Sequence, residues 1–195
     1  MLARLKRETQ SHQLGADEDR LAPLRTTTTP PLYKSYLARV FGFEAPVESA
    51  FLATPGFGTL LELPWRSQMR LLRADLTALG VIDPSALPTC PISRFSSEIE
   101  AFGWLYVVEH SAVGHAQLRR HFERWIPAQL ALAGSYLLGG ERGIGDRLRE
   151  LGAALDGYAK DPAIATKIVA AAQAGFRVQR QWFRLSAPPR LRAAR

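Results

Sequence analysis

Cysteine is almost absent from the sequence: the 195 residues contain one, Cys90. A single thiol forms no internal disulfide, and by itself it does not supply the ligand set of a structural zinc site. Neither oxidation nor a cysteine-rich metal centre therefore holds the fold together. With 47% hydrophobic residues, the chain is long enough to bury one core of ordinary size, and we expect a single domain.

Long apolar runs are also missing. No stretch reaches the roughly 18 consecutive apolar residues that indicate a membrane span. The N-terminus, MLARLKRETQ, carries charges where a signal peptide has its apolar segment. We therefore expect a cytoplasmic protein that makes no contact with a membrane.

Acidic residues are outnumbered by basic ones, and the formal net charge is +7. A basic surface favours phosphate binding, so nucleic acid has to be considered as a partner. The arginines are spread over the whole chain, and the densest groups are the segment LRRHFERW at 118–125, which contains His121, and the C-terminal tail. Without aromatic side chains interleaved in a strand pattern, this distribution is typical of a solvated basic face, and we do not expect nucleic acid binding.

Strand-like alternation is lacking, whereas helical periodicity runs through most of the chain. It predicts helices at 2–14, 30–52, 67–79, 96–118, 119–138, 144–159 and 162–184. We expect an interruption or bend in the second near Gly42 and Pro46, and a bend in the fifth at Pro127. The fold class is all-α, with one helical domain over 1–184. The basic tail 185–195 has too few apolar residues to pack, so we expect it to be disordered.

Several helix ends have clear signals. Thr29 and Asp161 each precede a proline, and this order is typical of an N-cap followed by the first helical residue. Gly80 is well placed to end the helix at 67–79. The segment 81–94, which is rich in proline, is predicted to be a loop.

Five segments, taken in their order along the chain, resemble the bacterial heme oxygenases, in particular the group associated with bacterial phytochromes. They are LKRET at 5–9, YKSYLARVFGFEAPVE at 33–48, RSQMRLLRADLTALG at 66–80, GWLYVVEHSAVGH at 103–115 and AAAQAGFRVQRQWF at 170–183. The resemblance implies a helical bundle that holds heme, as both cofactor and substrate, between its first helix and the helix containing 103–115. It also implies cleavage of heme to biliverdin, CO and iron by O2, electrons from a reductase, and possible transfer of biliverdin to a phytochrome-type acceptor.

The first helix departs from the pattern of the family it resembles. In that pattern a threonine is followed four residues later by the histidine that binds the iron. Counting from Thr9 gives Gln13, whereas the histidine of this chain is His12. One residue on a helix is a rotation of about 100°, enough to turn a ligand away from the iron. Either His12, after a one-residue shift, or Gln13 occupies the proximal position.

The distal motif departs as well. Relatives have Glu-Gly-Ser and, two residues later, Gly-Gly, and these glycines let the helix approach the porphyrin. Here Ser111 and Gly114 are kept as candidate catalytic residues, while His110 and His115 replace two glycines. His110 either binds the iron opposite His12 or obstructs the porphyrin. Alternatively, His110 and His115 are hydrogen-bonded core residues that touch no cofactor.

Arginines are expected near the heme propionates. Arg147 and Arg149 are the candidates, since the corresponding helix of the family faces the pocket rim, and Arg177 and Arg180 are alternatives. A diiron centre is a competing hypothesis, but the Glu-x-x-His pattern that such centres use is missing from the sequence. Two functions are left open: heme cleavage, or a related protein without catalysis that binds a tetrapyrrole or a protein partner.

Overall fold

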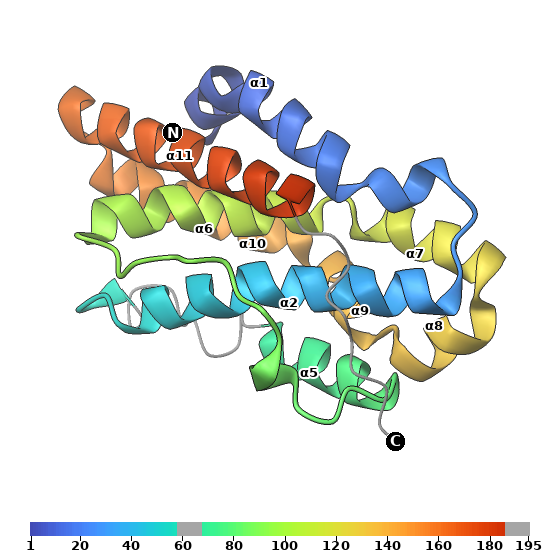
Figure 1. The fold of residues 1–195 in the computed structure, drawn as a ribbon. Helices are drawn as coiled ribbons and strands as arrows, with labels where there is room; N and C mark the ends of the chain where they lie inside the picture. Colours follow the sequence, from blue (N-terminus) through green and yellow to red (C-terminus); the bar gives the residue numbers. More distant parts are fainter. Residues whose placement is uncertain (58–67, 186–195) are drawn as a thin grey trace.

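The computed structural model describes residues 1–57 and 68–185. All the regular secondary structure in these ranges is helical (Figure 1). The predicted all-α class is therefore confirmed. The predicted disorder of the tail concerns residues that, from 186 onward, lie outside the described ranges. Within the described ranges, no helix is long and apolar enough to cross a membrane.

The described helices follow the predicted ranges closely at some ends and depart from them at others. They are α1 (Leu2–Arg20), η1 (Ala22–Arg25), α2 (Pro30–Leu52), α5 (Met69–Ala78), η2 (Pro84–Ala86), α6 (Glu98–Ala112), α7 (His115–Trp125), α8 (Pro127–Ala133), α9 (Ser135–Glu141), α10 (Ile144–Tyr158) and α11 (Pro162–Leu185). Asp161 caps α11, because its carboxylate accepts a hydrogen bond of 2.7 Å from the backbone N–H of Ala163. Gly80, with a φ of 78°, follows α5 as predicted.

The first helix is longer than its sequence pattern predicts. It was expected to end at 14, but α1 continues through Gly15 and the acidic segment to Arg20. Gly15 allows the guanidinium of Arg180 on α11 to lie close to α1, since a Cβ at this position would be 2.7 Å from it. The carboxylate of Asp19 pairs with Arg180 and Arg184, at 3.1 and 2.8 Å. Contacts with α11 thus hold the polar end of α1 in helical form.

The second helix has no interruption. It passes through Gly42 with Pro46 inside it, so of the predicted alternatives, an interruption or a bend, the interruption is excluded. Gly42 allows a close approach of the loop that follows η2, because a Cβ here would collide with the backbone oxygen of Pro88. The carbonyl of Gly42 also accepts a 2.7 Å hydrogen bond from the N–H of Cys90. A Cβ on Gly42 would also meet the indole ring of Trp182, 2.6 Å away.

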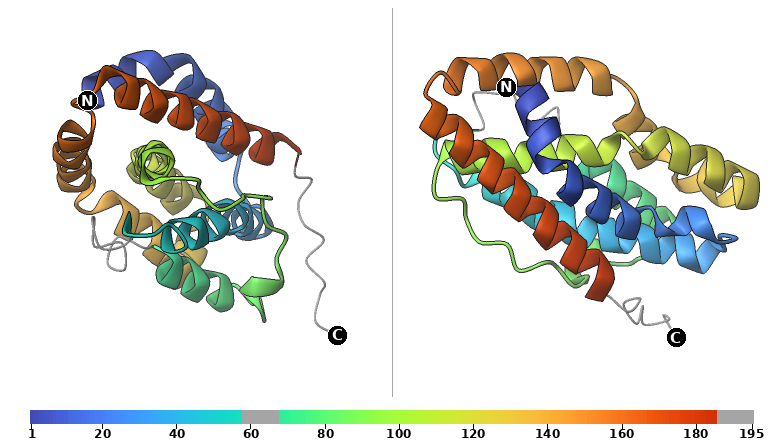
Figure 2. Two further views of the ribbon diagram at one scale, coloured as in Figure 1. Left: turned by 90° about the vertical axis from the view of Figure 1, so that its left-hand side faces the viewer. Right: turned by 90° about the horizontal axis from the view of Figure 1, so that it is seen from above.

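Helix α6 is the central helix of the molecule. The view along its axis in Figure 2 shows it surrounded by α1, α11, α10, α9 and α2. Apolar residues occur on every side of α6, which is the pattern of a helix buried all round. The sequence predicted one helix over 96–118, but the helix is interrupted at Val113 and Gly114, and α7 begins at His115.

Two glycines bring α6 and α11 close together. A Cβ on Gly103 would lie 2.7 Å from both the backbone nitrogen of Ala172 and the carbonyl oxygen of Ile168. A Cβ on Gly175 would lie 2.9 Å from a methyl group of Val107. We call this contact the glycine seam. Helix α1 packs closely on α11 in turn, whereas α1 and α6 meet mainly through long side chains.

Candidate functional site

A stripe of polar residues lies along the side of α1 that faces the interior. Thr9, Gln13, Asp17 and Arg20 are spaced by four, four and three positions, so they share one face of the helix. Three of the four are buried and Asp17 is partly buried. Because buried polar groups need hydrogen-bond partners, this stripe determines how α1 meets α6.

Gln13, and not His12, occupies the inward position on α1. The amide nitrogen of Gln13 donates to the hydroxyl of Tyr106 on α6, at 2.8 Å, and to the hydroxyl of Thr9, at 2.5 Å. His12 lies on another face, where its Nε2 is 3.2 Å from the guanidinium of Arg177 on α11. Partial burial and the nearby Arg177 charge lower the pKa of His12. The one-residue shift that would turn His12 toward α6 is therefore not present.

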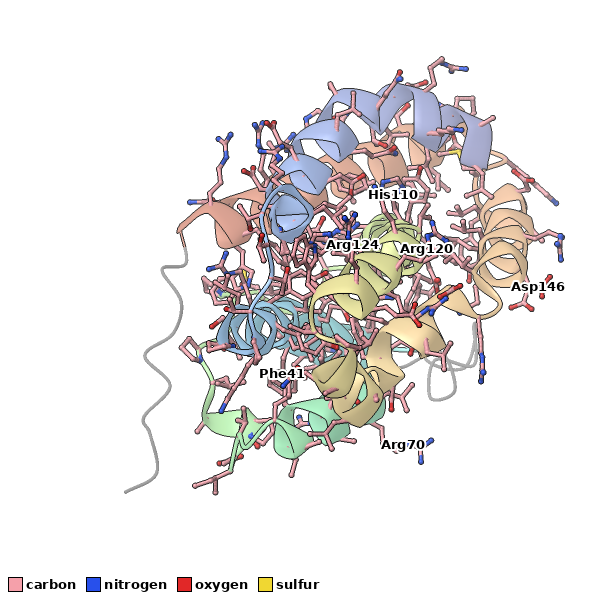
Figure 3. All side chains as sticks on the ribbon, turned by 90° about the vertical axis from the view of Figure 1, so that its right-hand side faces the viewer. Phe41, Arg70, His110, Arg120, Arg124 and Asp146 are labelled. Atoms are coloured by element: carbon pink, nitrogen blue, oxygen red, sulfur yellow. The ribbon has the colours of Figure 1, made fainter. Side chains whose placement is uncertain are left out.

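His110 extends from α6 toward α1, as Figure 3 shows, and its Nε2 lies 3.1 Å from Oδ2 of Asp17. The ring also packs edge-to-face on Phe176, with 5.5 Å between the ring centroids. Burial acts to raise the pKa of Asp17, but the hydrogen bond with His110 and the charge of Arg20 outweigh it and lower the pKa. His110 is thus a partner of Asp17 in the helix interface.

Arg20 fills the space in front of Gly114. Its Nη2 lies 3.0 Å from the point that a Cβ on Gly114 would occupy, and the side chain is almost fully buried. Nη2 also donates to Asp17, at 3.1 Å. The Gly114 position, where the family pattern leaves room beside the porphyrin, is closed by a guanidinium.

Ser111 and His115 are both buried. The Ser111 hydroxyl donates to the carbonyl of Val107, at 2.9 Å, and accepts from the amide of Gln179 on α11, at 2.8 Å. His115 packs against the ring of Tyr136, with 4.8 Å between centroids. Burial, together with the charges of Arg20 and Arg147, lowers the pKa of His115 to about 3. His115 is therefore neutral at ordinary pH.

The two candidate propionate arginines have different surroundings. Arg147 is buried, pairs with Glu109 on α6 at 2.9 Å, and donates to the carbonyls of Arg142 and Gly140 at the end of α9. Arg149 is exposed and pairs with Asp146 one turn away on α10, at 2.6 Å. Arg147 thus joins three helices, and Arg149 lies on the surface of α10.

The side chains between α1 and α6 do not fit a heme. The hydrogen bonds from Gln13 to Tyr106 and between Asp17 and His110 join the two helices directly. Arg20 occupies the remaining space at Gly114. A neutral amide at the proximal position is not among the usual axial ligands of heme iron. Within residues 1–57 and 68–185, no group of three or more His, Cys, Asp or Glu is placed to hold a metal ion either.

Most residues of the polar interior were not among the predicted site residues. We define the polar core as Gln13, Asp17, Arg20, Tyr36, Glu44, Tyr106, His110, Tyr136 and Gln179. The spacing of the polar stripe on α1 was an available signal, but it crosses the predicted end of that helix at 14. The other members come from α2, α6, α9 and α11, and their meeting depends on the tertiary fold.

Glu44 is the acidic group of this core on α2. Its carboxylate accepts a 2.7 Å hydrogen bond from the hydroxyl of Tyr136. Burial of the carboxyl group raises the pKa of Glu44 to about 7, against the opposing effects of the Tyr136 hydrogen bond and the Arg20 charge. Burial also raises the pKa of Tyr36 to about 12. Glu44 consequently changes its charge near neutral pH.

A cleft of about 310 Å³ opens on the outer side of the polar core. It lies between the ends of α1 and α11, η1 and the first half of α2. Arg20, Tyr36 and Phe183 line both this cleft and a tighter polar pocket behind it, which Glu44 and Tyr136 also line. Arg20 and Tyr36 therefore lie between the cleft and the rest of the polar core.

Comparison with known proteins gives no relative: no protein-family model, no curated protein and no solved structure matches the chain significantly. The likeness to heme oxygenases thus rests on the five segments of the sequence.

Proposed function

We propose that the protein is a binding protein related to the heme oxygenases that does not cleave heme. One observation carries the proposal: Gln13 and Asp17 hydrogen-bond directly to Tyr106 and His110, so side chains of this chain fill the gap in which the family holds its porphyrin. The order of the five sequence segments favours common ancestry with the heme oxygenases. The filled gap between α1 and α6 favours a loss of heme cleavage.

The reaction expected from the resemblance places specific demands on the two helices. It requires an imidazole on one side of the iron and open space on the other, for oxygen and for the porphyrin ring. Gln13 supplies no imidazole, and Arg20 with His110 takes up the open side. The reductase and the phytochrome-type acceptor have a role only if heme is cleaved, so they are tested together with the activity.

Titration with hemin tests this proposal. We expect the purified protein to leave hemin with the broad absorption band of the free compound and to form no biliverdin with a reductase. A sharp Soret band at one hemin per chain, accompanied by biliverdin formation, would overturn the proposal.

A gain-of-binding variant makes the test sharper. The combined change Gln13→His, His110→Gly and Arg20→Ala provides an inward imidazole and removes two side chains from the gap. We expect this variant to acquire a sharp Soret band that the wild type lacks. The matched control is Gln13→His alone, which leaves the gap filled and should not load hemin. Equal loading of the wild type and the triple variant would contradict the argument.

A further inference from the structure

We propose that the cleft beside Arg20 and Tyr36 binds a small organic carboxylate that has an apolar part. The cleft volume of about 310 Å³ lies at the lower end of the range of small-molecule sites. It is lined by side chains from four helical segments, namely α1, η1, α2 and α11.

Two buried hydrogen-bonding groups lie at the inner wall of this cleft. Arg20 is 3% exposed and Tyr36 is 6% exposed. Neither Nε of Arg20 nor the hydroxyl of Tyr36 has a hydrogen-bond partner of good geometry among the described residues. Buried polar groups in folded proteins are almost always hydrogen-bonded, because an unmet donor loses its hydration without compensation. An acceptor entering from the cleft would satisfy both groups.

The charges around the cleft favour an anion. Arg20 and Arg39 both line it. The cleft also contains the carboxylate of Asp19, but this group is already paired with Arg180 and Arg184, at 3.1 and 2.8 Å. A carboxylate is the planar anion that a guanidinium binds through two hydrogen bonds at once. The group that the inner wall selects is therefore a carboxylate.

The cleft also has apolar lining. Leu32, Pro23 and Phe183 border it, and Leu32 is 51% exposed. A ligand that joins a carboxylate to an aromatic or aliphatic body would cover Leu32 while its acid group meets Arg20. Inorganic phosphate has no such body, so it should bind more weakly.

This inference rests on the proposed function, because it names the class of ligand that a binding protein without heme cleavage would take. The proposed function and the ligand are tested by separate measurements. Hemin absorption reports on the gap between α1 and α6, and binding of a small acid reports on the cleft. A protein that loads hemin and also binds the acid at Arg20 would overturn the first proposal and support the second.

Isothermal titration calorimetry with benzoate as the probe tests the cleft. We expect benzoate to bind with a Kd on the order of 1 mM or below, and we expect the neutral isostere benzamide and inorganic phosphate each to bind at least about ten times more weakly. Absence of binding by benzoate, or equal binding of benzamide, would overturn the proposal. Equal binding of phosphate would reject the apolar part of the ligand.

Two variants locate the binding. Arg20→Met should weaken benzoate binding by about tenfold or more, and Tyr36→Phe, which keeps the shape of the ring, by about fivefold. Tyr36→Phe keeps the test valid if Arg20→Met fails to fold, as circular dichroism would reveal. Arg7→Met is the matched control, because Arg7 lies on an exposed face of α1 and should leave the Kd unchanged. Unchanged benzoate affinity in Tyr36→Phe would place the ligand elsewhere and contradict the inference.

Discussion

Helix α6 has two contrasting neighbours. Toward α11 it forms the glycine seam, where Gly103 and Gly175 allow close approach of the two helices. Toward α1 the backbones stay further apart, and long polar side chains such as Gln13 and His110 span the distance. The comparison shows that a helix can be held by close packing on one side and by a hydrogen-bonded polar layer on the other.

The two contacts differ in how they respond to change. Close packing at the glycine seam leaves no space for added atoms, so small enlargements are costly. The polar layer contains groups whose charge depends on pH, so it responds to protonation and to removal of a partner. Four substitutions, in decreasing order of expected effect, test how α6 is held by its neighbours.

Arg147→Met should have the largest effect. It leaves Glu109 buried next to α10 without the guanidinium that lies 2.9 Å away. Breaking a buried ion pair by removing one partner costs about 3–5 kcal/mol. Urea denaturation should show this loss in the free energy of unfolding. Arg149→Met is the control, because its exposed pair with Asp146 should contribute less than about 1 kcal/mol; similar losses in both variants would contradict the prediction.

Gly103→Val should break the glycine seam. The new side chain would press on the backbone of α11 at Ile168 and Ala172, which has little freedom to move. We expect a loss of about 2–3 kcal/mol in the free energy of unfolding, measured by urea denaturation.

Gly157→Ala on α10 is the matched control for the seam. No atom lies within 4 Å of the added Cβ, apart from the helix's own backbone and chain neighbours. This change should stabilise the protein by roughly 0.5–1 kcal/mol, because alanine favours the helix. Equal behaviour of the two glycine variants would show that the seam is not tightly packed.

Glu44→Gln should alter the pH dependence of stability below neutrality. The folded-state pKa of Glu44 is about 7, above its unfolded value, so the folded state binds this proton more tightly. The wild type should therefore lose stability as the pH rises from about 4.5 to about 7, by on the order of 2 kcal/mol, and change little beyond. Glu44→Gln should lack this loss when urea midpoints at pH 5 and pH 8 are compared. An unchanged difference between the two pH values would rule out burial of the charge.

Asp17→Asn should have the smallest effect, with the opposite pH dependence. The folded-state pKa of Asp17 is lowered, so the stability it contributes is present above the unfolded pKa of about 3.9 and is lost as the pH falls through the folded value. We expect the variant to be less stable by about 1 kcal/mol at pH 7 and equal to the wild type at low pH. Glu18→Gln, at an exposed neighbour on α1, should have little effect at either pH. A constant difference at all pH values would contradict this role for Asp17.

The helical class and several helix ends could be predicted from the amino-acid sequence. Helical periodicity, the proline after Asp161 and the glycine at 80 are signals that depend only on residues close together in the sequence. They can therefore be interpreted without knowing how the helices pack. The long continuation of α1 and the break after Ala112 were missed, because each depends on the contacts of that segment with other helices.

Which polar residues meet could not be predicted from the sequence, because it depends on how the helices pack. The sequence left His12 and Gln13 open for the inward position, and the packing of α1 on α11 turned Gln13 toward Tyr106. The sequence likewise left open whether His110 is a ligand or a core residue, and the approach of α1 gave it Asp17 as a partner. Helical geometry fixes the angle between side chains of the same helix. The face that a helix turns toward its neighbours depends on the total burial that it gains against all of them.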